Sequence, residues 1–151
     1  MNKIHFQLVT PERTVLEEEL DSLSCPTELG QITILPSHVP LVATITPGEL
    51  IARAGEKEHS IAVSGGFVEI RPNNQVIVLA DAAEHYYEID TKRAEEAVKR
   101  AQVAMKEKAM SAEEYARVAA SLQQSLSRLN IARKHSHRRT APLSGEGVFK
   151  E

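Results

Sequence analysis

Side chains that could perform acid–base, nucleophilic or metal chemistry are scattered along the 151-residue chain. The six histidines include one close pair, His135 and His137, with no cysteine or carboxylate beside it to complete a metal site. Ser64-Gly65-Gly66 resembles an oxyanion loop only superficially, because two glycines between strands are far more often a tight turn or bulge. The chain has no phosphate-binding loop, dinucleotide fingerprint or nucleophile elbow. The sequence therefore predicts no catalytic residue, no metal site and no required cofactor.

One segment has the features of an anion site. In Ile89-Asp90-Thr91-Lys92-Arg93-Ala94, Asp90 is placed to cap a helix, and two cations follow it. The free amides of a helix N-terminus bind anions, and the guanidinium of Arg93 suits a phosphate. An ordinary capped helix accounts for the same residues, so both interpretations stay open at this point.

The lone cysteine and the start of the chain bear on localisation. Cys25 has no partner for a disulfide within the chain, which fits a reducing compartment and a small core residue. The first residues lack the basic start and apolar run of a signal peptide, and no segment is apolar for long enough to span a bilayer. We expect a cytoplasmic protein with no membrane insertion of its own.

Charge is distributed unevenly although the net charge is only −3. Residues 12–28 are acidic, with Arg13 as the only cation, whereas residues 115–145 contain no carboxylate and six cations: Arg117, Arg128, Arg133, Lys134, Arg138 and Arg139. This asymmetry predicts two different partners, the second of them acidic. A nucleic-acid-binding module is the rival interpretation, but the basic region lacks the interleaved aromatic residues expected for single strands, and the chain is acidic overall.

Two kinds of element must position these residues. Ile4, Phe6 and Leu8 alternate with polar neighbours, which is typical of a half-buried strand. Further short apolar stretches separated by turn residues predict strands at 32–34, 39–45, 50–54, 60–64, 66–70 and 75–80. No helical pattern interrupts this region, so an antiparallel sandwich or barrel is expected. We interpret the acidic run at 17–19 as a solvated edge.

The pattern becomes helical after Asp81. Residues 90–109 are good helix formers, with an apolar face of Ala94, Ala97, Val98, Ala101, Ala104 and Met105. Ser111 and Glu114 form a capping box at the start of a second helix, whose apolar face is Tyr115, Val118, Ala119, Leu122, Leu126 and Leu129. The short joint predicts an antiparallel hairpin. Because this hairpin has a small apolar core, its contact with the sandwich is predicted to be weak enough to detach.

Four segments in order resemble the epsilon subunit of bacterial F-type ATP synthases. They are VTPER at 9–13, the G-x-x-x-I-L-P-x-H-x-P pattern at 30–40, GGFVEI at 65–70 and VLADAAE at 78–84, and the helical hairpin follows them. The resemblance covers residues 6–134. It implies a ten-stranded β-sandwich with a C-terminal helical hairpin, placed in the central rotor of a bacterial plasma-membrane ATP synthase. The domains are then a sandwich at 1–86, a regulatory hairpin at 87–134 and a basic, disordered tail at 135–151.

The resemblance also implies partners and site residues. It implies binding to the gamma subunit and the c-ring, with Glu28, Gln31 and Ile32 at the c-ring and His38 on the gamma side. It implies that the raised hairpin inhibits ATP hydrolysis, and Arg128, Arg133 and Lys134 would then meet acidic segments of the alpha and beta subunits.

A regulatory ATP is implied by the I/L-D-x-x-R-A motif at residues 89–94. The residues carried over are Glu84, Ile89, Asp90, Arg93, Ala94, Arg100 and Arg128. Gln124 stands where the ATP-binding members have a further cation, and this departure counts against tight binding. A stand-alone nucleotide sensor is the remaining alternative.

Overall fold

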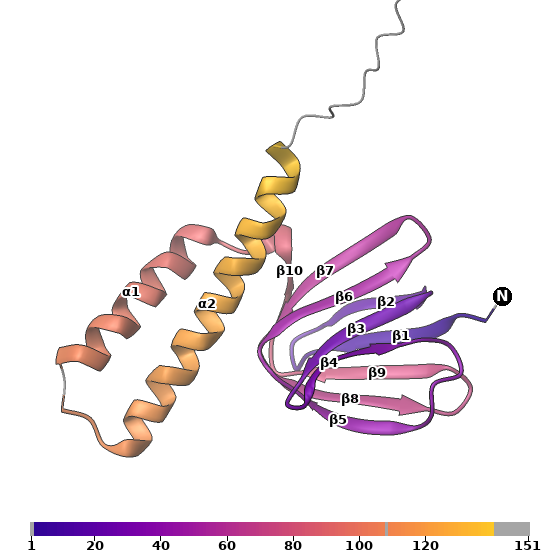
Figure 1. Cartoon of the computed structure of the whole chain (residues 1–151), viewed down its shortest axis with the longest axis horizontal. Coiled ribbons are helices and arrows are strands. Elements are labelled where there is room, and N and C mark those ends of the chain that lie inside the picture. The colour runs from indigo at the N-terminus through magenta and orange to yellow at the C-terminus, as the bar shows by residue number, and fades with distance from the viewer. Residues whose placement is uncertain (1, 108, 141–151) are drawn as a thin grey trace, which may run out of the picture.

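The computed structural model describes residues 2–107 and 109–136 in full, and residues 137–140 as helical backbone. A β-sandwich is followed by two antiparallel helices that lie beside one end of it (Figure 1). The strands are β1 (Ile4–Val9), β2 (Thr14–Leu20), β3 (Ser22–Thr27), β4 (Gly30–Ile34), β5 (Leu41–Ile45), β6 (Gly48–Ala54), β7 (Lys57–Val63), β8 (Gly66–Arg71), β9 (Gln75–Ala80) and β10 (Ala83–His85). The predicted fold class, a ten-stranded sandwich with a helical hairpin, is confirmed.

The strand order is β10-β7-β6-β3-β5-β8-β9-β1-β2, with β4 paired to β3. Every pair is antiparallel except β1 with β9, in which Phe6 lies beside Val76 and Leu8 beside Val78. The prediction of antiparallel strands throughout is wrong for this pair. Parallel neighbours need a long crossover connection, and here most of the sandwich lies between β1 and β9 in the chain.

Aliphatic side chains from both layers fill the sandwich core. Phe6 is the largest of the fully buried side chains, and the other large ones, from β1 and from seven further strands, are Ile4, Leu8, Leu20, Leu23, Ile34, Leu50, Ile61, Val68, Val76 and Val78. All the buried residues of this cluster lie on the strands, and none of the described residues of the two helices belongs to it. The sandwich core is therefore closed independently of the hairpin.

The acidic N-terminal stretch forms two strands that the sequence pattern did not predict. Residues 17–19 lie on β2, the terminal strand of the sheet order, so the solvated edge is where it was expected. Glu18 nevertheless contacts the ring Nε2 of His59 at 2.7 Å, with both side chains about one-third exposed or less. The alternation of apolar and polar residues along β2 is not visible in the sequence, because its inward-facing position 18 holds a glutamate that pairs with His59.

The two helices begin as predicted. Helix α1 (Thr91–Glu107) is capped by Asp90, whose Oδ1 accepts a hydrogen bond from the Arg93 amide at 3.1 Å. Helix α2 (Ala112–Thr140) starts with the predicted capping box between Ser111 and Glu114. Ala94, Val98 and Ala101 are buried on α1, as expected. Neither helix, over its described residues, is long and apolar enough to cross a membrane.

The end of the second helix differs from the prediction. Helix α2 continues to Thr140, so residues 135–140 are helical rather than part of a tail that begins after Lys134. Contacts with the sandwich explain this extension, because the side chain of His135 is buried between β6 and the short 3-10 helix η1 (Tyr86–Glu88). Residues 141–151 of the predicted tail lie outside the described residues. The buried face of α2 lies closer to the C-terminus of the helix than predicted. Tyr115 is half-exposed, whereas Ser125, Leu129 and Ile131 are buried.

Cys25 is expected to be unreactive toward thiol reagents in the native protein. Its side chain is fully buried on β3, and burial raises the pKa of the thiol to about 12. Since the thiolate is the reactive form, modification should occur only when the sandwich unfolds. The measurement is the rate of modification by an aromatic disulfide reagent against denaturant concentration. Rapid stoichiometric labelling without denaturant would contradict the prediction.

Candidate functional site

The hairpin contacts the sandwich through a small apolar cluster that is separate from the sandwich core. Ala62 of β7, Ile89 before α1 and Ile131 of α2 are its buried members, and Tyr86 and Ala132 pack against them. Burial of so few aliphatic side chains stabilises docking by only a few kcal/mol, on the order of 1.5–3 kcal/mol for each large one. Charged contacts around the cluster therefore have a large relative influence on docking.

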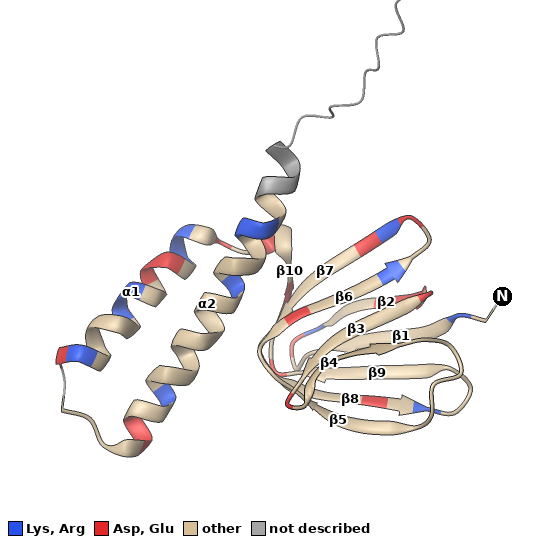
Figure 2. Cartoon of the chain, in the orientation of Figure 1, with Lys and Arg blue, Asp and Glu red and all other residues tan. Residues whose placement is uncertain are grey.

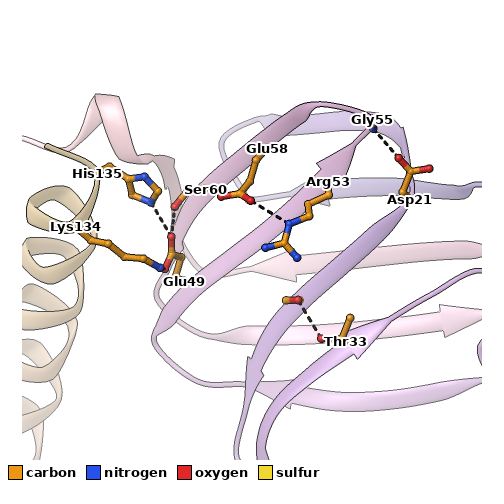
Figure 3. Close-up of polar contacts among 10 residues, drawn as sticks. Asp21, Thr33, Glu49, Arg53, Gly55, Glu58, Ser60, Lys134 and His135 are labelled. Carbon is orange, nitrogen blue, oxygen red and sulfur yellow. Dashed lines mark hydrogen bonds and ion pairs between the residues drawn. The ribbon is translucent and has the colours of Figure 1, made fainter. Parts of the chain in front are cut away.

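Glu49 at the start of β6 is the main polar contact (Figure 3). Lys134 donates from Nζ to Oε2 at 2.9 Å, and the Nε2 atom of His135 lies 2.8 Å from Oε1. Ser60, diagonally across on β7, donates its hydroxyl to the same Oε1. The Glu49 side chain is 15% exposed and that of His135 is 8% exposed. The His135 ring also stacks on Tyr86, with ring centroids 4.4 Å apart.

The environment of Glu49 keeps its carboxylate charged. Burial acts to raise the pKa of Glu49, but hydrogen bonds from Lys134, Ser60 and His135 together outweigh burial and lower the pKa below its ordinary value. A carboxylate that accepts several hydrogen bonds is stabilised in its ionised form. At neutral pH Glu49 is therefore an anion that faces the basic end of α2.

Two more ion pairs connect α2 to the rest of the chain. Arg128 donates from Nε to Glu84 of β10, and Arg133 contacts Glu95 of α1 at 3.3 Å. Figure 2 shows cations in the C-terminal half of α2, a further one near the start of the helix, and acidic residues on the neighbouring segments. All three predicted inhibitory residues, Arg128, Arg133 and Lys134, are thus paired with carboxylates of their own chain.

A cavity of about 580 Å³ lies between the sandwich and α2. Arg13 and Arg128 line it, and both are paired, Arg13 with Glu88 at 3.0 Å and Arg128 with Glu84. Its other lining residues are Thr10, Glu12, Ala62, Val63, Ser64, Asp81, Ala82, Ala83, Gln124 and Ser125. Four carboxylates against two guanidinium groups give the cavity a negative balance, so a polyphosphate has to displace a carboxylate from an arginine to bind there.

The structure brings together only part of the predicted nucleotide set. Glu84 and Arg128 form an ion pair at the cavity, and Gln124 lies beside them. Asp90 and Arg93 meet at the start of α1, but neither lines this cavity. Ile89 and Ala94 are buried in packing roles, and Arg100 is exposed on α1.

The predicted c-ring and gamma residues lie at opposite ends of β4. Glu28 and Gln31 are exposed at the β3–β4 turn, whereas Ile32 is half-buried, and Leu29 between them is fully exposed. His38 lies in the loop after β4, where its Nδ1 is 2.7 Å from the Val39 carbonyl oxygen. The backbone amide of Ser37 in that loop donates to Asn74 at 2.6 Å.

Sequence reasoning missed Glu49 and Ser60. Glu49 follows the turn residues Thr46-Pro47-Gly48, and nothing in this local pattern marks a carboxylate that contacts Lys134, 85 residues later. The pair His135 and His137 was tested only as a metal site. His135 instead contacts Glu49, and the side chain of His137 lies outside the described residues.

The contribution of Glu49 to stability is expected to depend on pH. Because its folded-state pKa is lowered from 4.5, its contribution is complete above pH 4.5 and is lost as the pH falls through the folded-state value. Glu49→Gln should therefore reduce docking stability by about 1–2 kcal/mol at pH 7, and the difference from wild type should shrink steadily below pH 4.5. Chemical denaturation of both proteins from pH 7 to pH 3 measures this, and a difference independent of pH would contradict it.

Comparison with known proteins gives the same division of the chain. Residues 3–86 match the family model described as ATP synthase, Delta/Epsilon chain, beta-sandwich domain, and residues 88–133 match its long alpha-helix domain. An ATP synthase epsilon chain of Dehalococcoides mccartyi is 45% identical over 134 residues, covering 89% of this chain and 95% of the relative. The epsilon chain of Herpetosiphon aurantiacus is 42% identical and covers 89% of this chain and 98% of the relative. That of Halalkalibacterium halodurans is 39% identical and covers 87% of this chain and 98% of the relative.

Solved structures share the fold at lower identity. A chain of the Euglena gracilis mitochondrial ATP synthase, in a structure of OSCP/F1/c-ring, has a TM-score of 0.72 at 21% identity and covers 83% of this chain and 80% of its own length. A chain of the Tetrahymena thermophila central stalk/c-ring structure has a TM-score of 0.56 at 16% identity, with coverage of 90% and 99%. The matches to both domains, and the identity to relatives over nearly their whole length, show that this chain belongs to the ATP synthase delta/epsilon chain family.

Proposed function

We propose that the protein is a non-catalytic rotor subunit in the central stalk of an F-type ATP synthase. It couples rotation of the c-ring to ATP synthesis and inhibits ATP hydrolysis when its hairpin detaches. Its place is at the cytoplasmic face of the bacterial plasma membrane, as a peripheral part of the complex. The names of the relatives, ATP synthase epsilon chain, support the subunit assignment.

One observation carries the inhibitory part of the proposal: the hairpin and the sandwich have separate apolar clusters. Detachment of α2 exposes a few side chains such as Ile89 and Ile131 but leaves the sandwich core closed. A two-state element of this kind can move without unfolding the domain that anchors it. The ligand or partner that prefers one state then shifts the population by its differential affinity.

The anchoring contacts are proposed at the ends of the sandwich. The exposed turn with Glu28, Leu29 and Gln31 is the proposed c-ring contact, together with Ile32, and His38 is the proposed gamma contact. Residues 28–31 are all exposed, which leaves this turn accessible to a partner. Two solved structures that share the fold come from assemblies whose titles include a c-ring, which supports a c-ring partner.

In the raised state, Arg128, Arg133 and Lys134 are proposed to contact acidic segments of the alpha and beta subunits. Helix α2 carries no carboxylate after Glu114 among its described residues, so a negative surface attracts its whole C-terminal half.

Truncation after Asp90 tests this function. The shortened chain keeps the entire sandwich and should assemble normally with gamma, but it has no hairpin to raise. ATP hydrolysis by the reconstituted enzyme is expected to rise several-fold. Recovery of gamma and the catalytic head with the tagged truncated chain is the control for assembly. Unchanged hydrolysis in a fully assembled complex would refute inhibition by the hairpin.

Regulatory ATP binding at the hairpin is a separate proposal. The capped start of α1 offers backbone amides and Arg93, and Arg128 becomes available when it leaves Glu84. Titration of ATP onto the isolated full-length chain should show saturable binding that Arg93→Ala abolishes. Lys92→Ala, which removes a neighbouring exposed cation at a variable position of the motif, should retain binding. No saturation up to millimolar ATP would refute this proposal.

A further inference from the structure

Three cations of α2 at residues 128–134 are already paired with carboxylates within the chain. Arg128 contacts Glu84, Arg133 contacts Glu95, and Lys134 contacts Glu49. These three carboxylates come from β10, α1 and β6. In the docked state each of these three cations already has a carboxylate partner within the chain, which an external acidic partner must compete with.

We propose that Glu49 is an intramolecular catch that occupies the C-terminal end of α2, so that docking on the sandwich and binding of an acidic partner exclude one another. This inference rests on the proposed function, in which α2 presents its cations to the catalytic head. Glu49 then has a regulatory role, because it competes with the partner for Lys134 and keeps the hairpin docked on the sandwich.

Glu49 carries this role better than the other two carboxylates because it is the least exposed. Its side chain is 15% exposed, against 26% for Glu84 and 46% for Glu95. Exposed ion pairs contribute little to stability because water and salt screen them. Glu49 also binds two consecutive residues of α2, and Ser60 of β7 holds its carboxylate in place.

Several contacts with the sandwich are concentrated on one turn of α2. Ile131 is buried in the apolar cluster one turn before His135, whose ring is stacked on Tyr86. Lys134 and His135 are consecutive on the same helix, so detachment of α2 breaks both of their contacts with Glu49 together. The titratable and charged groups at this contact include Glu49 from β6, Tyr86 from η1, and Lys134 and His135 from α2.

The first test measures docking in the isolated full-length chain. Glu49→Gln preserves shape but removes the charge, and Glu69→Gln is the matched control, because Glu69 pairs with Arg71 at 2.9 Å within β8. Hydrogen exchange of the amides at 126–136 should accelerate about tenfold in Glu49→Gln, while the amides of β8 and β9 keep their wild-type rates. Glu69→Gln should leave 126–136 unchanged. Wild-type exchange at 126–136 in Glu49→Gln, with an intact sandwich, would overturn the proposal.

A second variant identifies the partner of Glu49. Lys134→Met should accelerate exchange at 126–136 as well, and the double variant should exchange no faster than about the Glu49→Gln protein, since one contact cannot be lost twice. If the accelerations of exchange in the two single variants multiply in the double variant, Lys134 acts independently of Glu49 and the catch is overturned.

A third measurement separates this inference from the function on which it rests. In the reconstituted complex, Glu49→Gln should lower ATP hydrolysis several-fold, because more hairpins are raised. Accelerated exchange with unchanged hydrolysis would support the catch and refute inhibition by the hairpin. Unaccelerated exchange would refute the catch whatever the truncated chain does to hydrolysis.

Discussion

Gly66→Ala is expected to prevent the sandwich from folding stably. Gly66 opens β8 with φ +135°, and a Cβ added there would lie 2.0 Å from the Leu79 carbonyl oxygen and 2.9 Å from the Ala80 Cα. These are backbone atoms of β9, the strand to which Gly66 is paired, so no side-chain rotation relieves the overlap. Separation of β8 from β9 is the only response, at a cost of roughly 4 kcal/mol or more. The measurement is the free energy of unfolding by denaturant, or the soluble yield if the protein does not fold.

Gly55→Ala is the matched control for this prediction. Gly55, in the turn between β6 and β7, also has a positive φ of +62°, but an added Cβ meets nothing within 4 Å. The cost is then the backbone strain alone, about 1–2 kcal/mol. Equal losses for the two variants would show that positive φ, rather than the close approach of β9, makes Gly66 necessary.

Ile131→Ala is expected to shift the hairpin toward its detached state without destabilising the sandwich. Ile131 is 5% exposed and belongs to the cluster with Ala62 and Ile89. Its truncation should cost about 2 kcal/mol of docking free energy, or roughly thirtyfold in the docking equilibrium. An isolated helix is marginally stable in water, so a detached α2 becomes a protease substrate. Limited trypsin cleavage after Arg128, Arg133 and Lys134 should accelerate by the same factor.

Ser121→Ala provides the control on the same helix. Ser121 is exposed on α2, away from the cluster, so its removal should leave the cleavage rate at the wild-type value. Denaturation of Ile131→Ala should show the sandwich transition unchanged, because the sandwich core contains no described hairpin residue. A thirtyfold acceleration accompanied by loss of the sandwich would instead indicate that the two clusters unfold together.

Local patterns in the sequence predicted the elements whose stability is local. The cap at Asp90, the capping box at Ser111 and Glu114, and the buried face of Ala94, Val98 and Ala101 depend on residues three or four positions apart. The alternation of Ile4, Phe6 and Leu8 likewise marks one face of one strand. These features are confirmed because each is encoded within a single turn or strand.

Features that depend on distant segments were predicted poorly. The pattern of β2 contains Glu18, which meets His59 on another strand, and no local signal identifies that partner. The extension of α2 to Thr140 depends on Glu49 and Tyr86 in the same way. The candidate site consists mainly of such pairings, which is why its best-connected residue, Glu49, was not identified from the sequence.

The parallel pairing of β1 with β9 has a consequence for the order in which the chain acquires its structure during synthesis. Ile4, Phe6 and Leu8 are made first, yet their neighbours on β9 follow about 70 residues later, since His5 pairs with Gln75. Contacts of such sequence separation slow folding, because a long loop must close before they form. A ribosome-bound chain therefore leaves one hydrogen-bonding edge of its apolar first strand unpaired until β9 emerges, and a chaperone that binds extended apolar segments has its natural target there.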